Sequence, residues 1–140
     1  MPELKTYDIF ICHAWFYSKG YNKAVELLDE ATNLKWRNYS VPEHDPVIDP
    51  KTEVGKRKLS LELYQQIKPV NCFLVMAGMY ASYKYWIQKE IDIAQEYHKP
   101  IIGLIPWGQK KTPQSIQDVA VEMVGWNTSS IVDAIRRNSI

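Results

Sequence analysis

The order of its apolar runs and helical patterns constrains the fold of this chain more than any other feature. Short apolar or alternating runs are typical of β-strands, and longer amphipathic stretches are typical of α-helices. Strands are expected near residues 7–12, 35–41, 70–77, 101–107 and 120–126, and helices near 21–32, 54–68, 81–99, 114–119 and 128–138. Because strands and helices alternate throughout, the sequence predicts an α/β fold with a parallel sheet between two layers of helices.

The run VNCFLVMA (70–77) is nearly all apolar, which indicates a central strand that helices cover on both faces. We therefore expect a flavodoxin-like, three-layer sandwich with about five strands in the order 2-1-3-4-5. In such a sheet, ligands bind at the carboxyl ends of the strands where the strand order reverses, here between the first and third strands. The segments after these two strands, CHAWFYSKG (12–20) and GMYASYKYW (78–86), form the candidate site.

Length, charge and composition exclude several classes of protein. The 140 residues contain no evident linker or internal repeat, so a single domain over residues 1–140 is expected. With 17 basic and 16 acidic residues the net charge is +1, which argues against nucleic-acid binding. The N-terminus lacks a signal-peptide pattern and no apolar run is long enough to span a membrane, so we expect a cytoplasmic protein without a membrane partner.

Several site motifs are missing from the candidate segments. CHAWFYSKG contains neither of the glycine-rich motifs that bind nucleotide phosphates. The third strand ends in Met76 and Ala77 rather than in the aspartate of a phospho-acceptor domain, and the GxSxG of a hydrolase is absent. Cys12 and Cys72 have no metal-ligand spacing and lie in strand-like runs, so both are expected to be small buried hydrophobes. We expect no metal and no prosthetic group.

Glu90 is unusual in the predicted third helix. At about 100° per residue, Glu90 falls within the apolar arc of Ile87 and Ile91, whereas Asp92 and Glu96 fall on the opposite, polar side. Burying a carboxylate is costly unless it is paired or hydrogen-bonded. Two interpretations fit. Glu90 either pairs with a basic side chain or reaches water at the sheet edge, or it is a functional carboxylate in a partly dry ligand cleft.

Three segments of the chain resemble TIR-like domains. YDIFICHAW (7–15) resembles their opening strand and loop, with Cys12 where a serine is usual. WRNYSVPEHDP (36–46) resembles the second strand and following loop of bacterial and archaeal TIR-like proteins. YWIQKEIDIAQEYHKPIIGLIPW (85–107) resembles the segment that carries the W-x-x-x-E pattern and the fourth strand. The three matches, in order, are most similar to the Thoeris anti-phage TIR signalling proteins.

This resemblance implies an enzyme that cleaves the nicotinamide–ribose bond of NAD⁺. Glu90 stands at the position of the glutamate that is essential in catalytic TIR domains. NAD⁺ is then a substrate rather than a cofactor, and its ADP-ribosyl part is hydrolysed, cyclised or transferred. In Thoeris-like systems the product is a signalling nucleotide that activates a separate effector after phage infection. The chemistry suits a carboxylate, which can stabilise the positive charge that develops on the ribose.

Candidate substrate-binding residues accompany Glu90 in the resembling segments. They are His13, Ala14, Trp15, Arg37, Asn38, Tyr39, Tyr83 and Trp86. The aromatic side chains among them can stack on flat rings, the loop after the first strand can bring a backbone amide to the ligand, and the end of the second strand can frame the pocket or contact phosphate. Structural alternatives are packing of Trp86 in the core, capping of the loop by His13 and an ion pair of Arg37 with Glu43 or Asp45.

A second interpretation is a non-catalytic TIR-like adaptor. It would bind another TIR domain or an effector through its aromatic surface and the proline-rich segment PEHDPVIDP (42–50). In TIR domains the corresponding loop shapes the pocket and mediates self-association, so the resemblance implies self-association in either case. A domain that binds a nucleotide without cleaving it is a third possibility.

Overall fold

The computed structural model describes residues 6–12, 19–32, 34–40, 52–76, 84–105 and 114–139. At residues 19–21, 56, 59, 84–86 and 115 it describes the backbone alone. The strands are β1 (Thr6–Cys12), β2 (Lys35–Asn38), β3 (Cys72–Met76), β4 (Ile101–Ile105) and β5 (Glu122–Gly125). The helices are α1 (Lys19–Asp29), α2 (Glu53–Ile67), α3 (Lys84–Glu96), α4 (Gln114–Gln117) and α5 (Thr128–Asn138).

The strands form one parallel sheet in the order β2-β1-β3-β4-β5. This order confirms the predicted α/β, flavodoxin-like topology. The strand order reverses between β1 and β3, which pair side by side with Cys12 opposite Val75. The carboxyl end of β1 therefore lies at the point where sheets of this class bind ligands.

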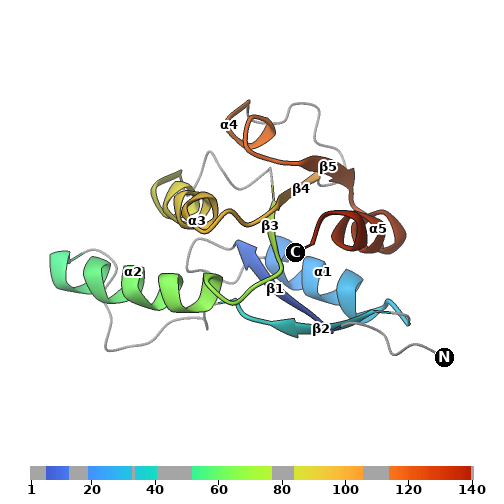
Figure 1. The fold of residues 1–140 in the computed structure, drawn as a ribbon, viewed down its shortest axis with the longest axis horizontal. Coiled ribbons are helices and arrows are strands. Elements are labelled where there is room, and N and C mark those ends of the chain that lie inside the picture. The colour runs from blue at the N-terminus through green and yellow to red at the C-terminus, as the bar shows by residue number, and fades with distance from the viewer. Residues whose placement is uncertain are drawn as a thin grey trace.

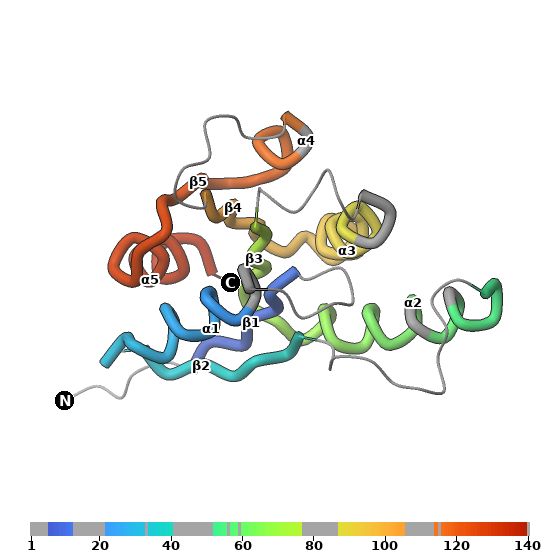
Figure 2. Tube along the Cα trace, turned by 180° about the vertical axis from the view of Figure 1, so that it is seen from behind, coloured from blue at the N-terminus to red at the C-terminus, as the bar shows by residue number. Residues whose placement is uncertain are grey.

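Helices cover both faces of the sheet (Figure 1). On one face, which we call the α3 face, buried side chains of α2, α3 and α4 pack on β1, β3 and β4. On the other, the α5 face, α1 and α5 pack on the same strands. Figure 2 shows the arrangement from behind, with the N-terminal turns of α2 extending beyond the sheet. All five side chains of β3 are buried, as the apolar run 70–77 predicted.

The side chains of β1 alternate between the two faces because a strand has a period of two residues. Phe10 and Cys12 contribute to the core of the α3 face, and Ile9 and Ile11 to that of the α5 face. Cys12, the last residue of β1, thus points its side chain to the layer that contains α3. This placement decides which helix meets the end of β1.

The bounds of α5 match the helix expected at residues 128–138, and its N-cap directly precedes them. The N-cap is Asn127, whose side chain accepts a hydrogen bond from the Ser130 N–H at 2.9 Å. Asn127 has the extended backbone that an N-cap requires, and Thr128 is the first helical residue. The Thr128 hydroxyl donates to the Leu27 carbonyl oxygen at 2.8 Å and joins α5 to α1.

The predicted third helix differs from α3 at its C-terminal end. The sequence predicted a helix that reaches residue 99, but α3 ends at Glu96. His98 has φ 56°, a left-handed conformation that stops the helix two residues before Pro100. The predicted first turn, residues 81–83, lies outside the described residues. Within the described part of the chain, no helix has the length and apolar character needed to cross a membrane.

Candidate active site

Glu90 lies on the inner side of α3, against the sheet. Its neighbours on that side, Ile87, Ile91 and Ala94, are buried, and Glu90 itself is 0% exposed. Asp92 and other polar side chains of α3 face solvent, so the burial that the helical spacing predicted for Glu90 is confirmed. Among the described residues, Glu90 is the one polar or charged side chain that the fold buries.

The Glu90 carboxylate meets the end of β1. The Cys12 thiol donates a hydrogen bond to Glu90 Oε2, with Sγ and Oε2 2.6 Å apart. Cys12 is 1% exposed and closes the carboxyl end of β1, beside β3. The contact therefore places the buried carboxylate at the reversal of strand order. The sequence predicted that Cys12 would be buried, which is confirmed, but not that it would contact Glu90.

The surroundings of this carboxylate are mainly apolar. The core of the α3 face around it includes Phe10, Val75, Ile87 and Ile91. A buried carboxylate loses its hydration, and a thiol is a weak hydrogen-bond donor. The Cys12 contact by itself therefore offsets only part of the cost of burying the charge. Groups held at such a cost in the ligand-binding region of a fold are candidates for function.

Arg37 of β2 lies away from this carboxylate. It pairs with Asp8 through two hydrogen bonds, Nε to Oδ1 at 2.6 Å and a terminal nitrogen to Oδ2 at 3.0 Å. Asp8 and Arg37 are partners in the β1–β2 register, so Arg37 lies level with a residue four positions before Cys12. The structural alternative for Arg37 was an ion pair with Glu43 or Asp45. Arg37 does form an ion pair, but its partner is Asp8. Its contact with substrate phosphate stays a prediction.

The two candidates that follow Arg37 differ in environment. Asn38 is exposed, and its side-chain oxygen accepts a hydrogen bond from the Ser40 N–H at 2.9 Å, which shapes the chain after β2. Tyr39 is half-buried and packs against the core of the α3 face. Its N–H donates to the Ile9 carbonyl oxygen at 2.9 Å, which continues the pairing with β1. Tyr39 thus shares the face of Glu90.

The side chains of the remaining candidates lie outside the described part of the structure. His13, Ala14, Trp15 and Tyr83 lie outside the described residues, as does the proline-rich segment 42–50. The backbone of Trp86 is part of α3, one turn before Glu90, and its side chain is not described. Their roles in substrate binding stay predictions.

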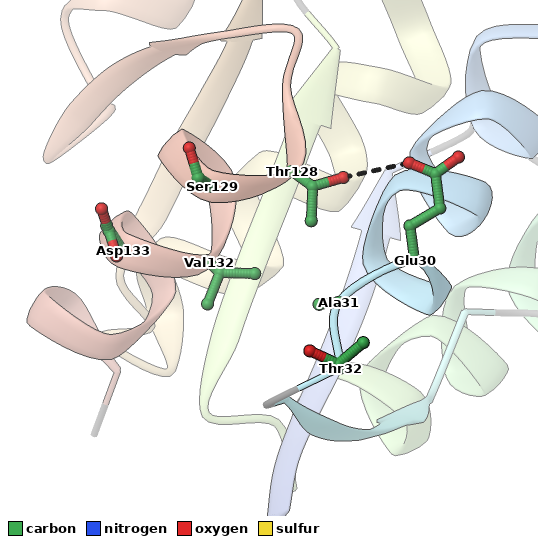
Figure 3. Close-up of a pocket in the computed structure, with 7 residues that line it drawn as sticks. All are labelled: Glu30, Ala31, Thr32, Thr128, Ser129, Val132 and Asp133. Atoms are coloured by element: carbon green, nitrogen blue, oxygen red, sulfur yellow. Dashed lines mark hydrogen bonds between the residues drawn. The ribbon is translucent and has the colours of Figure 1, made fainter.

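A pocket of about 280 Å³ lies elsewhere, between α1 and α5 (Figure 3). It is lined by Glu30, Ala31, Thr32, Thr128, Ser129, Val132 and Asp133. In Figure 3 the Thr128 hydroxyl points to the Glu30 carboxylate, 3.4 Å away. The described residues that line this pocket include two acids and no base, which does not favour a nucleotide. In the described part of the chain, no group of three His, Cys, Asp or Glu side chains is placed to hold a metal ion.

Comparisons with known proteins place the fold and the family. A crystal structure of a conserved protein from Enterococcus faecalis V583 is similar with a TM-score of 0.63 at 9% identity, covering 95% of this chain and 99% of that one. The CMP N-glycosidase BcmB of Clostridium botulinum is similar with a TM-score of 0.52 at 12% identity, covering 92% of this chain and 98% of that one. At these identities the likeness concerns the fold. No curated protein sequence matched the chain.

The family is shown by sequence. Residues 10–111 match the family described as Thoeris protein ThsB, TIR-like domain. The match spans most of the sheet, from β1 through β4, and includes Cys12, Tyr39 and Glu90. It confirms the resemblance that the three segments indicated. The chain belongs to the TIR-like domain family of the Thoeris protein ThsB.

Proposed function

We propose that this protein cleaves the nicotinamide–ribose bond of NAD⁺ and forms a signalling nucleotide derived from ADP-ribose, in defence against phage. Glu90 is the proposed catalytic residue. The observation that carries the proposal is the position of its carboxylate, which is buried against the end of β1 where the strand order reverses. Membership of the ThsB TIR-like family supports the same reaction class.

A carboxylate at this point suits the chemistry of the N-glycosidic bond. When the C–N bond breaks, both electrons leave with nicotinamide, which departs as a neutral molecule and needs no proton. The ribose carbon becomes an oxocarbenium-like cation, and an ionised Glu90 beside it would stabilise the positive charge. The cation is then captured by water, by an atom of the same nucleotide or by a separate acceptor. The three captures give ADP-ribose, a cyclic isomer or a conjugate.

The burial of Glu90 has a consequence for substrate access. Because the side chain is 0% exposed, substrate binding at Glu90 requires a change in the groups that cover it. Once substrate has entered, the apolar surroundings of the α3 face would keep bulk water out. Electrostatic stabilisation by a carboxylate is stronger in such a site than in water.

The similar fold of a CMP N-glycosidase suggests a second substrate to test. That protein acts on a nucleoside monophosphate, and the bond broken is again N-glycosidic. NAD⁺ remains our proposal because the family match and the position of Glu90 both favour a TIR-type reaction. The product is proposed to act on a separate effector.

The test is mass spectrometry of nucleotides after incubation of the purified protein with NAD⁺ and, in parallel, with CMP. We expect nicotinamide and an ADP-ribose-derived product from NAD⁺, and no cytosine from CMP. Release of cytosine with intact NAD⁺ would replace the substrate but keep the reaction class. Intact NAD⁺ and CMP, both with protein alone and in extract of phage-infected cells, would contradict the proposal and favour the adaptor.

A further inference from the structure

We propose that Cys12 is a positioning residue whose thiol holds the Glu90 carboxylate in the orientation that the reaction needs. This inference rests on the proposed function and extends it, because it names the side chain through which the sheet controls the catalytic residue. It follows from the direct contact between Cys12 Sγ and Glu90 Oε2.

The position of the Cys12 sulfur is fixed by the sheet. β1 lies between β2 and β3, and Cys12 itself is opposite Val75 of β3. On the other side, the Ile11 N–H donates to Ser40 Oγ at 2.9 Å, which ties the end of β1 to the chain after β2. A glutamate side chain on a helix has several rotatable bonds and needs a fixed partner to keep one orientation. The end of β1 provides that partner from a separate element.

A protonated Cys12 thiol and an ionised Glu90 carboxylate would complement each other in this contact. A thiol donates a hydrogen bond only while it is protonated, and a carboxylate is a pure acceptor when it is ionised. A hydrogen bond to an ionised group is stronger than one between neutral groups. The Cys12–Glu90 contact therefore favours the ionised carboxylate that would face a developing cation, and it directs Oε2 toward the end of β1.

Cys72 provides a matched control within the same sheet. It is also buried, but it begins β3 and belongs to the core of the α5 face, away from Glu90. Burial raises the pKa of its thiol to about 12, so Cys72 remains protonated at neutral pH. Cys12 and Cys72 are the two cysteines of the chain. Any effect that is specific to the Glu90 contact should appear at Cys12 and be absent at Cys72.

Steady-state kinetics with NAD⁺ test the positioning role. We expect Cys12→Ala to lower kcat about tenfold while KM changes by less than about twofold, because the lost hydrogen bond acts on the charged group. Cys12→Ser, whose hydroxyl can donate the same bond, should recover most of kcat, and Cys72→Ala should behave as wild type. Full or increased activity of Cys12→Ala, or a serine variant as slow as the alanine variant, would overturn the inference.

Raman spectroscopy of the S–H stretch detects the hydrogen bond from Cys12 to Glu90, whether or not the protein is active. In Cys72→Ala only the Cys12 band remains, and we expect Glu90→Gln to shift this band, because an amide oxygen accepts less strongly than a carboxylate. In Cys12→Ala the Cys72 band should not respond to the same substitution. An unshifted Cys12 band would overturn the inference while leaving the proposed function intact. An inactive wild type would instead overturn the proposed function, and with it the catalytic role of Cys12.

Discussion

The two faces of the sheet have cores of similar composition but differ in one buried charge. On the α5 face, the described buried side chains of α1, α5 and the strands are all apolar. On the α3 face, an equally apolar core includes Glu90, which reaches the end of β1. The α3 face thus combines its core with a group that is costly to bury, and the described buried side chains of the α5 face include no such group. Under the proposed function, this difference is where stability is given up for catalysis.

The largest expected effect tests whether both faces are required as cores. On the α3 face, Phe73 stacks on Phe10 with ring centroids 5.4 Å apart; the next residue, Leu74, is buried on the α5 face. We expect Phe73→Ala to reduce the free energy of unfolding by about 3–5 kcal/mol and Leu74→Ala by about 2–5 kcal/mol. Denaturant unfolding measures both. A loss below about 1 kcal/mol at either position would contradict the packing on that face.

Gly103 tests how tightly the α3 face is packed at β4. A Cβ there would overlap Met123 Sδ, lie 2.7 Å from Met123 Cε and lie 3.4 Å from Ile116 Cγ2. We expect Gly103→Ala to cost about 1 kcal/mol of unfolding free energy, because the end of the partly buried Met123 side chain must shift against the core. Gly125→Ala is the control, since its Cβ would lie 3.6 Å from the nearest Asn127 atom, an ordinary contact. Equal stability of the two variants would show that Met123 moves without cost.

The third prediction concerns the charge itself. If Glu90 is kept for function, Glu90→Leu should stabilise the fold, because the desolvation cost of the buried carboxylate is removed and only the hydrogen bond from the weak Cys12 thiol donor is lost. We expect an increase of about 1 kcal/mol in the free energy of unfolding, together with loss of NAD⁺ cleavage. Thermal or denaturant unfolding compares the variant with wild type. A clearly destabilised Glu90→Leu would mean that Glu90 is mainly a structural residue.

The smallest expected effect comes from removing the exposed ion pair between Arg137 and Glu122. Hydrogen bonds from Arg137, and then from Asn138, lower the pKa of the Glu122 carboxyl below its ordinary value of 4.5. Because the pKa of Glu122 is lower in the folded than in the unfolded state, its ionisation stabilises the fold at pH values above the unfolded-state pKa. This contribution is lost as the pH falls through the folded-state pKa. Arg137→Ala should therefore be slightly less stable than wild type at about pH 7, and the difference should shrink as pH falls below 4.5. A difference that persists at low pH would have another cause.

Much of the fold could be predicted because its signals are local. The apolar run 70–77 marked β3, and the spacing of Ile87, Glu90 and Ile91 on one helix predicted which side Glu90 would take. One helix end was less accurate, because the expected third helix ran to residue 99 whereas the left-handed backbone of His98 ends α3 at Glu96.

The site was harder to predict because its contacts join distant segments. Cys12 and Glu90 are 78 residues apart, and no local pattern links them. In the resembling domains a serine is usual at the position of Cys12. This was the one available signal that the side chain makes a polar contact. The partner of Arg37 was predicted in the following loop, but the register of β1 and β2 supplies Asp8 instead. Register depends on how whole strands pack, which single residues do not reveal.

The central claim is that the buried carboxylate of Glu90 carries out the cleavage, and nicotinamide release from NAD⁺ tests it most directly. Glu90→Gln keeps the size of the side chain and removes its charge; Glu96→Gln makes the same change on the exposed side of α3, where the amide oxygen can still accept from the Tyr64 hydroxyl. We expect Glu90→Gln to release nicotinamide at least about 100-fold more slowly than wild type, and Glu96→Gln to match wild type. Release by Glu90→Gln at the wild-type rate would contradict the account.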